Sequence, residues 1–411
     1  MDISLKFGFI GLGMGGCSIA YECATVNQNV RNNKYPYTAV LINTNNVDLR
    51  KLPDRTNTMK FLLRGYERGA GRDIQLGEEA FKKYKDEISK IVIDFFEDRD
   101  FLFVVCGLGG GTGTGSIIEA IRLLHSSGYA GRFGLILTLP RDQEGSQILD
   151  NAIKRLQVIA KAMRGLGSIL LVDNQKLFQE YLRSNSGGNV SSFLEHSNRY
   201  IAQMLHELNI VTIAHNPISG YHFDSSELLR MLQTPGVFTF GKCALEEYGV
   251  DAKSRGTYIS RLKRSIEDGV LSDGYDFTDT VRCAISMVAS SQGAKRIFTL
   301  GMVAAVEQQL ISYVPFASER PVAVYADEST HYLSIYSIFA GLRLPKRVVQ
   351  MIEAINRFER PEDKEDSPLN LLLGYKGQLN YEVQDLDALL EKEEQPVKEK
   401  LLSKNSDPFA F

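Results

Sequence analysis

The glycine-rich segment at residues 107–116 contains the residue types best suited to hold a polyphosphate. It follows an apolar run at 101–106 and precedes an amphipathic run at 117–124, an order that predicts strand, loop and helix. Glycines let a backbone approach a ligand closely, and the N–H groups at a helix start attract an anion. Thr112 and Thr114 add hydroxyl donors. A flexible linker is the weaker interpretation, because linkers do not join a buried strand to an apolar-faced helix.

Two carboxylates, Asp224 and Glu227, lie three residues apart and can face the same side of a helix start. By residue type and spacing, the favoured interpretation is structural. Asp224 would cap the helix and Glu227 would complete a capping box.

Asn198 is expected at the start of a long helix over 198–213. Its amide offers one acceptor and two donors, a set that can read the edge of a guanine base. The alternative interpretation is a helix N-cap.

Two other segments resemble phosphate loops less closely. Gly11, Gly13 and Gly16 satisfy the dinucleotide fingerprint, but that fingerprint needs an acidic residue after the second strand. Here the second strand is followed by the polar run at 43–46, which contains no acid and argues against a nicotinamide enzyme. The segment at 236–243 nearly matches a Walker A loop, but it ends in Cys and its aromatic interior predicts a strand.

The elements that position these residues alternate between strand and helix in the first part of the chain, which predicts a parallel sheet covered on both faces. Ligands bind such sheets at the carboxyl ends of the strands. Strands are expected at 6–10, 37–42, 101–106, 133–139 and 168–172, and helices within 19–24 and 74–96. Further along, strands are expected at 238–240, 296–300, 322–325 and 333–339, and a helix at 346–358.

Composition is that of a globular protein, with 411 residues, 44% hydrophobic and 24% charged residues, and a net charge of −3. No apolar run is long enough to span a membrane, and no signal peptide is evident, so a cytoplasmic location is expected. The five cysteines lack metal-binding spacing and are expected to be reduced. Residues 359–411 carry 13 acidic and 7 basic side chains and few aromatic ones, which predicts disorder in the absence of a partner.

The run Gly109 to Gly115 resembles, residue for residue, the phosphate loop of the tubulin and FtsZ superfamily. The resemblance implies an α/β fold with a Rossmann-like, parallel-sheet GTP-binding domain, a long central helix, a second α+β domain, and a C-terminal helix with a flexible tail. It also implies that GTP or GDP is bound by Gly11, Gly13, Met14, Gly15, Gly16, Asn43, Asn45, Ala70, Gly71, Gly109, Gly110, Gly111, Thr112, Gly113, Thr114, Gly115, Pro140, Arg141, Glu144, Asn174 and Asn198. Phe193 is a candidate for stacking on the base, because Leu194 stands where the superfamily has an aromatic residue.

In this superfamily, an acid pair after the central helix acts on the nucleotide of the neighbouring subunit. The resemblance therefore assigns a catalytic role to Asp224 and Glu227. It implies a GTPase activated by head-to-tail polymerisation, with Mg²⁺ held by phosphates and water rather than by direct protein ligands. A head-to-tail contact that does not close produces an open filament.

The runs at 6–17, 137–142, 234–237 and 341–348 resemble the TubZ family, the plasmid- and phage-borne branch of the superfamily. This implies DNA segregation in a bacterial host, with a TubR-like centromere adaptor bound by the tail and no direct contact with DNA or membrane. A cell-division FtsZ is the alternative, supported weakly by the chain end at 407–411. We expect a GTP-binding domain at 1–190, a central helix at 191–215, a second domain at 216–343, a C-terminal helix at 344–360 and an acidic tail at 361–411.

Overall fold

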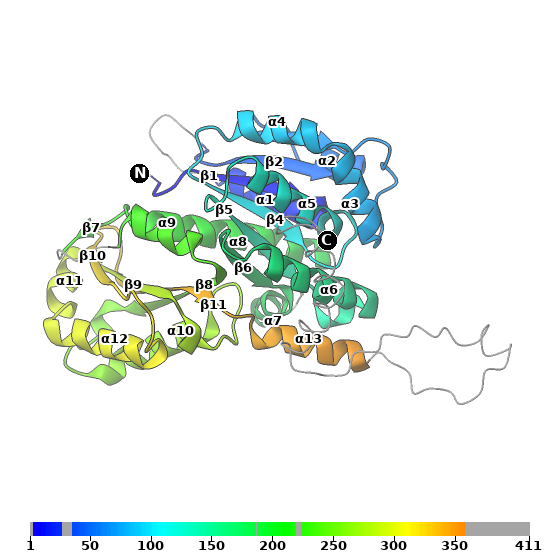
Figure 1. Cartoon of the computed structure of the whole chain (residues 1–411). Helices are drawn as coiled ribbons and strands as arrows, with labels where there is room; N and C mark the ends of the chain where they lie inside the picture. Colours follow the sequence, from blue (N-terminus) through cyan, green and yellow to red (C-terminus); the bar gives the residue numbers. More distant parts are fainter. Residues whose placement is uncertain (1–2, 27–34, 186, 219–222, 358–411) are drawn as a thin grey trace.

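The computed structural model describes residues 3–26, 35–185, 187–218 and 223–357. Its strands form one 11-stranded sheet in the order β3-β2-β1-β4-β5-β6-β8-β11-β9-β10-β7. In Figure 1 the elements coloured blue to cyan and those coloured yellow occupy opposite ends of the molecule, with α8 between them. The expected parallel arrangement is present from β3 to β8, because every neighbouring pair there is parallel. Pairing is antiparallel between β8 and β11, β11 and β9, and β10 and β7, and parallel between β9 and β10.

The strands and helices have the following bounds. The strands are β1 (Phe7–Leu12), β2 (Thr38–Asn43), β3 (Thr58–Leu62), β4 (Phe101–Gly107), β5 (Phe133–Leu139), β6 (Ser168–Asp173), β7 (Asn216–Pro217), β8 (Gly236–Glu246), β9 (Arg282–Ala289), β10 (Val322–Ala326) and β11 (Tyr332–Leu342). The helices are α1 (Gly13–Ala24), α2 (Asn46–Lys51), α3 (Ile74–Lys83), α4 (Lys85–Phe95), α5 (Thr112–Ser126), α6 (Ser146–Ala162), α7 (Asn174–Ser184), α8 (Val190–Ile210), α9 (Ser225–Gln233), α10 (Ile259–Asp268), α11 (Ser291–Ile297), α12 (Leu300–Tyr313) and α13 (Lys346–Arg357).

Alternating side chains along the strands place two hydrophobic clusters on the two faces of the sheet. In β1, Ile10 and Leu12 belong to one cluster, whereas Phe7 and Phe9 belong to the other. The second cluster also takes in the apolar side of α8, including Leu205. The central helix is therefore a core element, as its apolar stripe predicts.

Two sequence expectations about these elements were wrong. The run at 296–300 is not a strand; it contains the end of α11 and the start of α12, whose N-caps are Ser290 and Thr299. The long helix does not begin at Asn198. It begins at Val190, and its N-cap is Asn189, whose side chain accepts a hydrogen bond from the backbone N–H of Ser192. Asn198 therefore lies inside the helix and is not its N-cap.

The near-match to a Walker A loop at 236–243 is a strand, as its aromatic interior predicts. These residues form the first part of β8, which pairs with β11 along its whole length. Residues 358–411, which include the expected acidic tail and the end of the expected helix, lie outside the described residues. Within the described ranges, no helix combines the length and apolar character needed to cross a bilayer.

A buried polar network joins α8 to the start of the sheet. Asn209 donates from Nδ2 to the Leu5 carbonyl at 2.7 Å and to the Tyr37 hydroxyl at 3.0 Å. The Tyr37 oxygen accepts from Asn209, so the Tyr37 hydroxyl donates its own proton to Nδ1 of His206, 2.8 Å away. The neutral His206 ring therefore carries its hydrogen on Nε2. Burial lowers the pKa of His206 from 6.5 to about 4.

This depressed pKa predicts that acid destabilises the protein between about pH 6.5 and pH 4. The unfolded state gains a proton on His206 in this window before the folded state does, so stability present above pH 6.5 is lost as the pH falls, by about 3 kcal/mol once both states are protonated. His206→Gln keeps an acceptor for Tyr37 without titrating there. Urea unfolding should show a smaller loss of stability on acidification for this variant than for the wild type. Equal losses in the two proteins would contradict the assignment.

Candidate functional site

The loops expected to contact a nucleotide follow strands whose carboxyl ends lie at one edge of the sheet. These strands end at Leu12, Asn43, Gly107, Leu139 and Asp173. Because the strands are parallel and adjacent, all five loops emerge on the same side. The sheet thus gathers the predicted contacts from five separate parts of the chain.

The phosphate loops are joined to one another by hydrogen bonds. The hydroxyls of Thr44 and Thr112 lie 2.7 Å apart in the interior, which links the loop after β2 to the start of α5. The backbone N–H of Gly111 donates to the Gly71 carbonyl at 3.1 Å, which links the glycine loop to the segment before α3. Ala70, predicted with Gly71, is buried beside this contact.

The glycine loop is packed against protein on one side and open on the other. Gly109 has φ of +102°, and a Cβ there would lie 2.4 Å from the Ile148 side chain, so glycine is required. Its N–H donates to the Thr114 hydroxyl at 2.9 Å. A Cβ on Gly110, in contrast, would meet no atom within 4 Å. The exposed backbone at Gly110 is therefore the point where a ligand can approach.

The other residues predicted to contact the phosphates lie in the loops after β1 and β2. Asn43 is buried, and its Nδ2 has no hydrogen-bond partner among the described residues. Asn45 caps α2 by accepting from the N–H of Val47 at 2.8 Å. Met14, at the start of α1, is 57% exposed. The first loop meets the glycine loop directly, since Gly13 is in contact with the backbone of Gly113.

On the sugar side, the loop after β5 is organised by its own side chains. Glu144 accepts at Oε1 from the N–H of Arg141 at 2.9 Å, and the same oxygen lies 3.7 Å from the Arg141 Nε. The Arg141 guanidinium lies over the Phe178 ring, 4.4 Å from its centroid. Sequence reasoning had missed Phe178. The only signal was its position within the helix that follows Asn174.

On the base side, Asn174 is the first residue of α7 and Asn198 lies more than two turns into α8; both are half-buried. Phe193, the expected stacking residue, is 4% exposed and packs against Phe178 with ring centroids 5.1 Å apart. Phe178 is therefore the ring nearer to Arg141, whose guanidinium lies 6.0 Å from the Phe193 centroid.

Asp224 and Glu227 form a capping box at the start of α9. Asp224 Oδ1 accepts from the N–H groups of Ser226 and Glu227 at 2.8 and 2.9 Å, and Glu227 Oε2 accepts from the N–H of Asp224 at 2.9 Å. The structural interpretation of this pair is thus confirmed. Both side chains are half-buried and remain at the protein surface.

The two acids lie near the amino ends of the parallel strands, whereas the glycine loops follow their carboxyl ends. Ser225, the first residue of α9, has its hydroxyl 2.7 Å from that of Ser4, just before β1 begins. Gly13 lies just past the other end of β1, and a strand of six residues spans about 20 Å. One chain therefore cannot bring Asp224 to its own phosphate loops without refolding.

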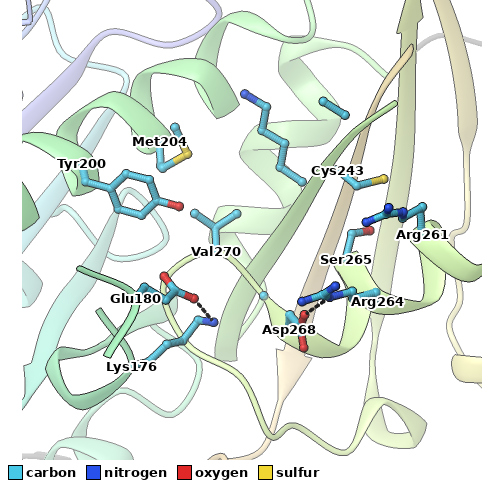
Figure 2. A pocket seen from close by; sticks show the side chains of 13 residues that line it. Lys176, Glu180, Tyr200, Met204, Cys243, Arg261, Arg264, Ser265, Asp268 and Val270 are labelled. Atoms are coloured by element: carbon cyan, nitrogen blue, oxygen red, sulfur yellow. Dashed lines mark hydrogen bonds and ion pairs between the residues drawn. The ribbon is translucent and has the colours of Figure 1, made fainter. Parts of the chain in front are cut away.

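A pocket of about 370 Å³ lies between α7, α8, β8 and α10 (Figure 2), and its lining contains no residue of the glycine loops. Of its four cationic side chains, Lys176, Lys242 and Arg264 are held in ion pairs with described residues, and Arg261 is not. Lys176 contacts Glu180 at 2.7 Å, Arg264 contacts Asp268 at 2.9 Å, and Lys242 contacts Glu207 of α8 at 2.6 Å. Because most of these charges are already paired, and the lining includes none of the predicted nucleotide contacts, the pocket is not part of the candidate site.

Comparison with known proteins agrees with this arrangement. Residues 6–181 match the model of the Tubulin/FtsZ family, GTPase domain, and residues 221–346 match that of the C-terminal domain of tubulin-like protein TubZ. The chain is 40% identical to the tubulin-like protein TubZ of Bacillus anthracis over 97% of both chains, and 40% identical to that of Bacillus cereus over 97% of this chain and 92% of the relative. A solved structure of GDP-form protofilaments of TubZ from Bacillus thuringiensis serovar israelensis has the same fold, with a TM-score of 0.72 and 19% identity over 87% of this chain and 92% of that one. The chain therefore has the tubulin/FtsZ fold and belongs to the TubZ family of tubulin-like proteins.

Proposed function

We propose that this protein is a GTPase that polymerises head to tail with GTP and segregates plasmid or phage DNA. The observation that carries the proposal is that the glycine loops and the Asp224–Glu227 pair lie at opposite ends of β1. Stacking one subunit on the next would bring the two together. The relative from Bacillus thuringiensis, solved as GDP-form protofilaments, supports the same assembly.

Nucleotide binding is assigned to the loops at the carboxyl edge of the sheet. Backbone N–H groups around Gly110 and the start of α5 would bind the phosphates, and the buried Nδ2 of Asn43 would satisfy its missing partner on a ligand oxygen. Glu144 and Arg141 are assigned to the sugar side, and Asn174 and Asn198 to the base.

Hydrolysis is assigned to the junction. The carboxylates of Asp224 and Glu227 from the neighbouring subunit would orient a water for in-line attack on the terminal phosphate. Mg²⁺ would enter with the nucleotide and neutralise phosphate charge. In the described ranges, no cluster of three His, Cys, Asp or Glu side chains is placed to bind a metal.

The domain limits and the partner remain part of the proposal. We assign a GTP-binding domain to 1–190, a central helix to 191–215, a second domain to 216–343 and a C-terminal helix to 344–360. The segment at 361–411 is assigned to a TubR-like adaptor, because an acidic tail suits a basic DNA-binding protein and repels DNA itself.

Right-angle light scattering tests the proposal directly. Addition of GTP with Mg²⁺ should raise scattering, whereas ATP or NAD should not, and scattering should fall as GTP is consumed. If GTP causes no rise in scattering at any protein concentration up to the solubility limit, filament formation is overturned. A rise with every nucleotide would overturn the guanine assignment.

Asn198→Ala tests recognition of the base. We expect the preference for GTP over ATP to fall by about tenfold or more, because a site that uses its polar groups to bind one base loses discrimination when they are removed. Competition binding against a fluorescent GDP analogue measures the ratio. Gln203→Ala removes an exposed amide from the same helix and should leave the ratio unchanged. An unchanged ratio in Asn198→Ala would remove Asn198 from the site.

A further inference from the structure

Arg347 is a buried cation in the first turn of α13. Its side chain is 5% exposed. A positive charge in the first turn opposes the helix dipole, and burial adds a desolvation cost, so helix stability does not account for an arginine there. The explanation lies in what the guanidinium contacts.

All three guanidinium nitrogens donate to groups of the nucleotide-binding half. Nη1 donates to Asp142 Oδ1 at 2.7 Å, Nη2 to the Pro140 carbonyl at 2.8 Å, and Nε to Asp173 Oδ1 at 3.2 Å. This fork geometry is specific to arginine, because a lysine presents a single point charge. Figure 1 shows α13 (orange) lying along α6 and α7, and contacts between α13 and α6 keep it there.

The three acceptors belong to the two loops assigned to the sugar and base. Pro140 and Asp142 flank Arg141 in the loop after β5. Asp173 caps α7 by accepting from the N–H of Gln175 at 2.9 Å, and Asn174 is the next residue. Burial raises the pKa of Asp173, and Arg347 opposes that rise by favouring the charged carboxylate. One side chain therefore sets the position of both loops.

We propose that Arg347 is a positioning residue for the nucleotide, which ties affinity for GTP and GDP to the docking of α13 on the GTP-binding half. The proposal rests on the proposed function, since it assumes that the loops after β5 and β6 contact the nucleotide. By linkage, nucleotide binding must in turn hold α13 in place, because a coupling free energy acts equally in both directions.

The test compares Arg347→Met with Arg343→Met. Arg343 precedes the same helix and pairs with Asp279 at 3.0 Å, but it is 77% exposed, so its loss is a matched control. Equilibrium titration with a fluorescent GDP analogue should give a Kd raised about 5- to 30-fold in Arg347→Met and unchanged in Arg343→Met. Arg347→Lys should fall between Arg347→Met and the wild type. GTP hydrolysis by Arg347→Met should show a raised KM with kcat within about twofold of the wild type.

Hydrogen exchange provides the reciprocal measurement. GDP should slow exchange of the α13 amides in the wild type and in Arg343→Met, and much less in Arg347→Met. An unchanged Kd in folded Arg347→Met, or equal protection of α13 in all three proteins, would overturn the coupling. If the wild type itself fails to bind GDP, the proposed function fails instead.

Asp142→Asn keeps the test decisive if Arg347→Met does not fold. Asp142 is 40% exposed, and its change leaves the Asp173 contact intact. We expect a severalfold rise in Kd with little loss of stability. An unchanged Kd in Asp142→Asn would overturn the positioning role of Arg347.

Discussion

Asp224→Asn is expected to lower steady-state GTP hydrolysis about 100-fold or more while filaments still form and then persist. Asparagine caps a helix as well as aspartate does, so α9 keeps its start, but the charge that orients water is removed. Phosphate release measured together with light scattering separates hydrolysis from assembly. A scattering plateau that no longer decays is the expected signature.

Asp276→Asn is the matched control for this substitution. Asp276 also caps a helical turn, by accepting from the N–H of Thr278 at 3.0 Å, and it is not among the residues assigned to the junction. Hydrolysis should be unchanged in this variant. If Asp224→Asn hydrolyses GTP at the wild-type rate, the acid pair has no catalytic role and serves only to cap α9.

Gly110→Val is expected to weaken GTP binding about 10- to 100-fold without changing the fold. A Cβ at this position meets no protein atom, so the free energy of unfolding should change by less than about 0.5 kcal/mol. The added side chain would occupy the space where phosphates approach, and one or two charged hydrogen bonds would be lost. Titration with a fluorescent GTP analogue and urea unfolding measure the two quantities.

Gly249→Val makes the same change at another glycine whose Cβ direction is open, in the second half of the chain. It should bind GTP as the wild type does. If Gly110→Val also binds normally, the phosphates do not lie against this loop.

Mixing the two defective variants tests where the active site is completed. Asp224→Asn retains the glycine loops, and Gly110→Val retains the acid pair. If the acids act on a neighbour's nucleotide, the mixture should hydrolyse GTP faster than either variant alone. No gain on mixing would contradict hydrolysis at the junction.

Much of the site could be predicted because its signals are local. The order of apolar run, glycines and amphipathic run between residues 101 and 124 predicted β4, the loop and α5, although α5 begins at Thr112, inside the run expected as a loop. The same reasoning failed at 296–300, because a short apolar run looks alike in a strand and at the junction of two helices. The N-caps Ser290 and Thr299 were the signals that distinguished them. The expectation that this helix starts at Asn198 was wrong for a similar reason, since polar residues after Asn189 mask the apolar pattern in the first turns of α8.

Local sequence accounts for the phosphate loop, the capping box and the family resemblance, because each depends on residues a few positions apart. The packing of distant segments accounts for the rest. It places the start of α9 beside Ser4, at the edge of the sheet opposite the glycine loops. It also brings Arg347 to acceptors 174 and 205 residues away along the chain. No local pattern encodes these contacts, because they arise from how helices α9 and α13 pack on a sheet whose strand order differs from the order of the chain.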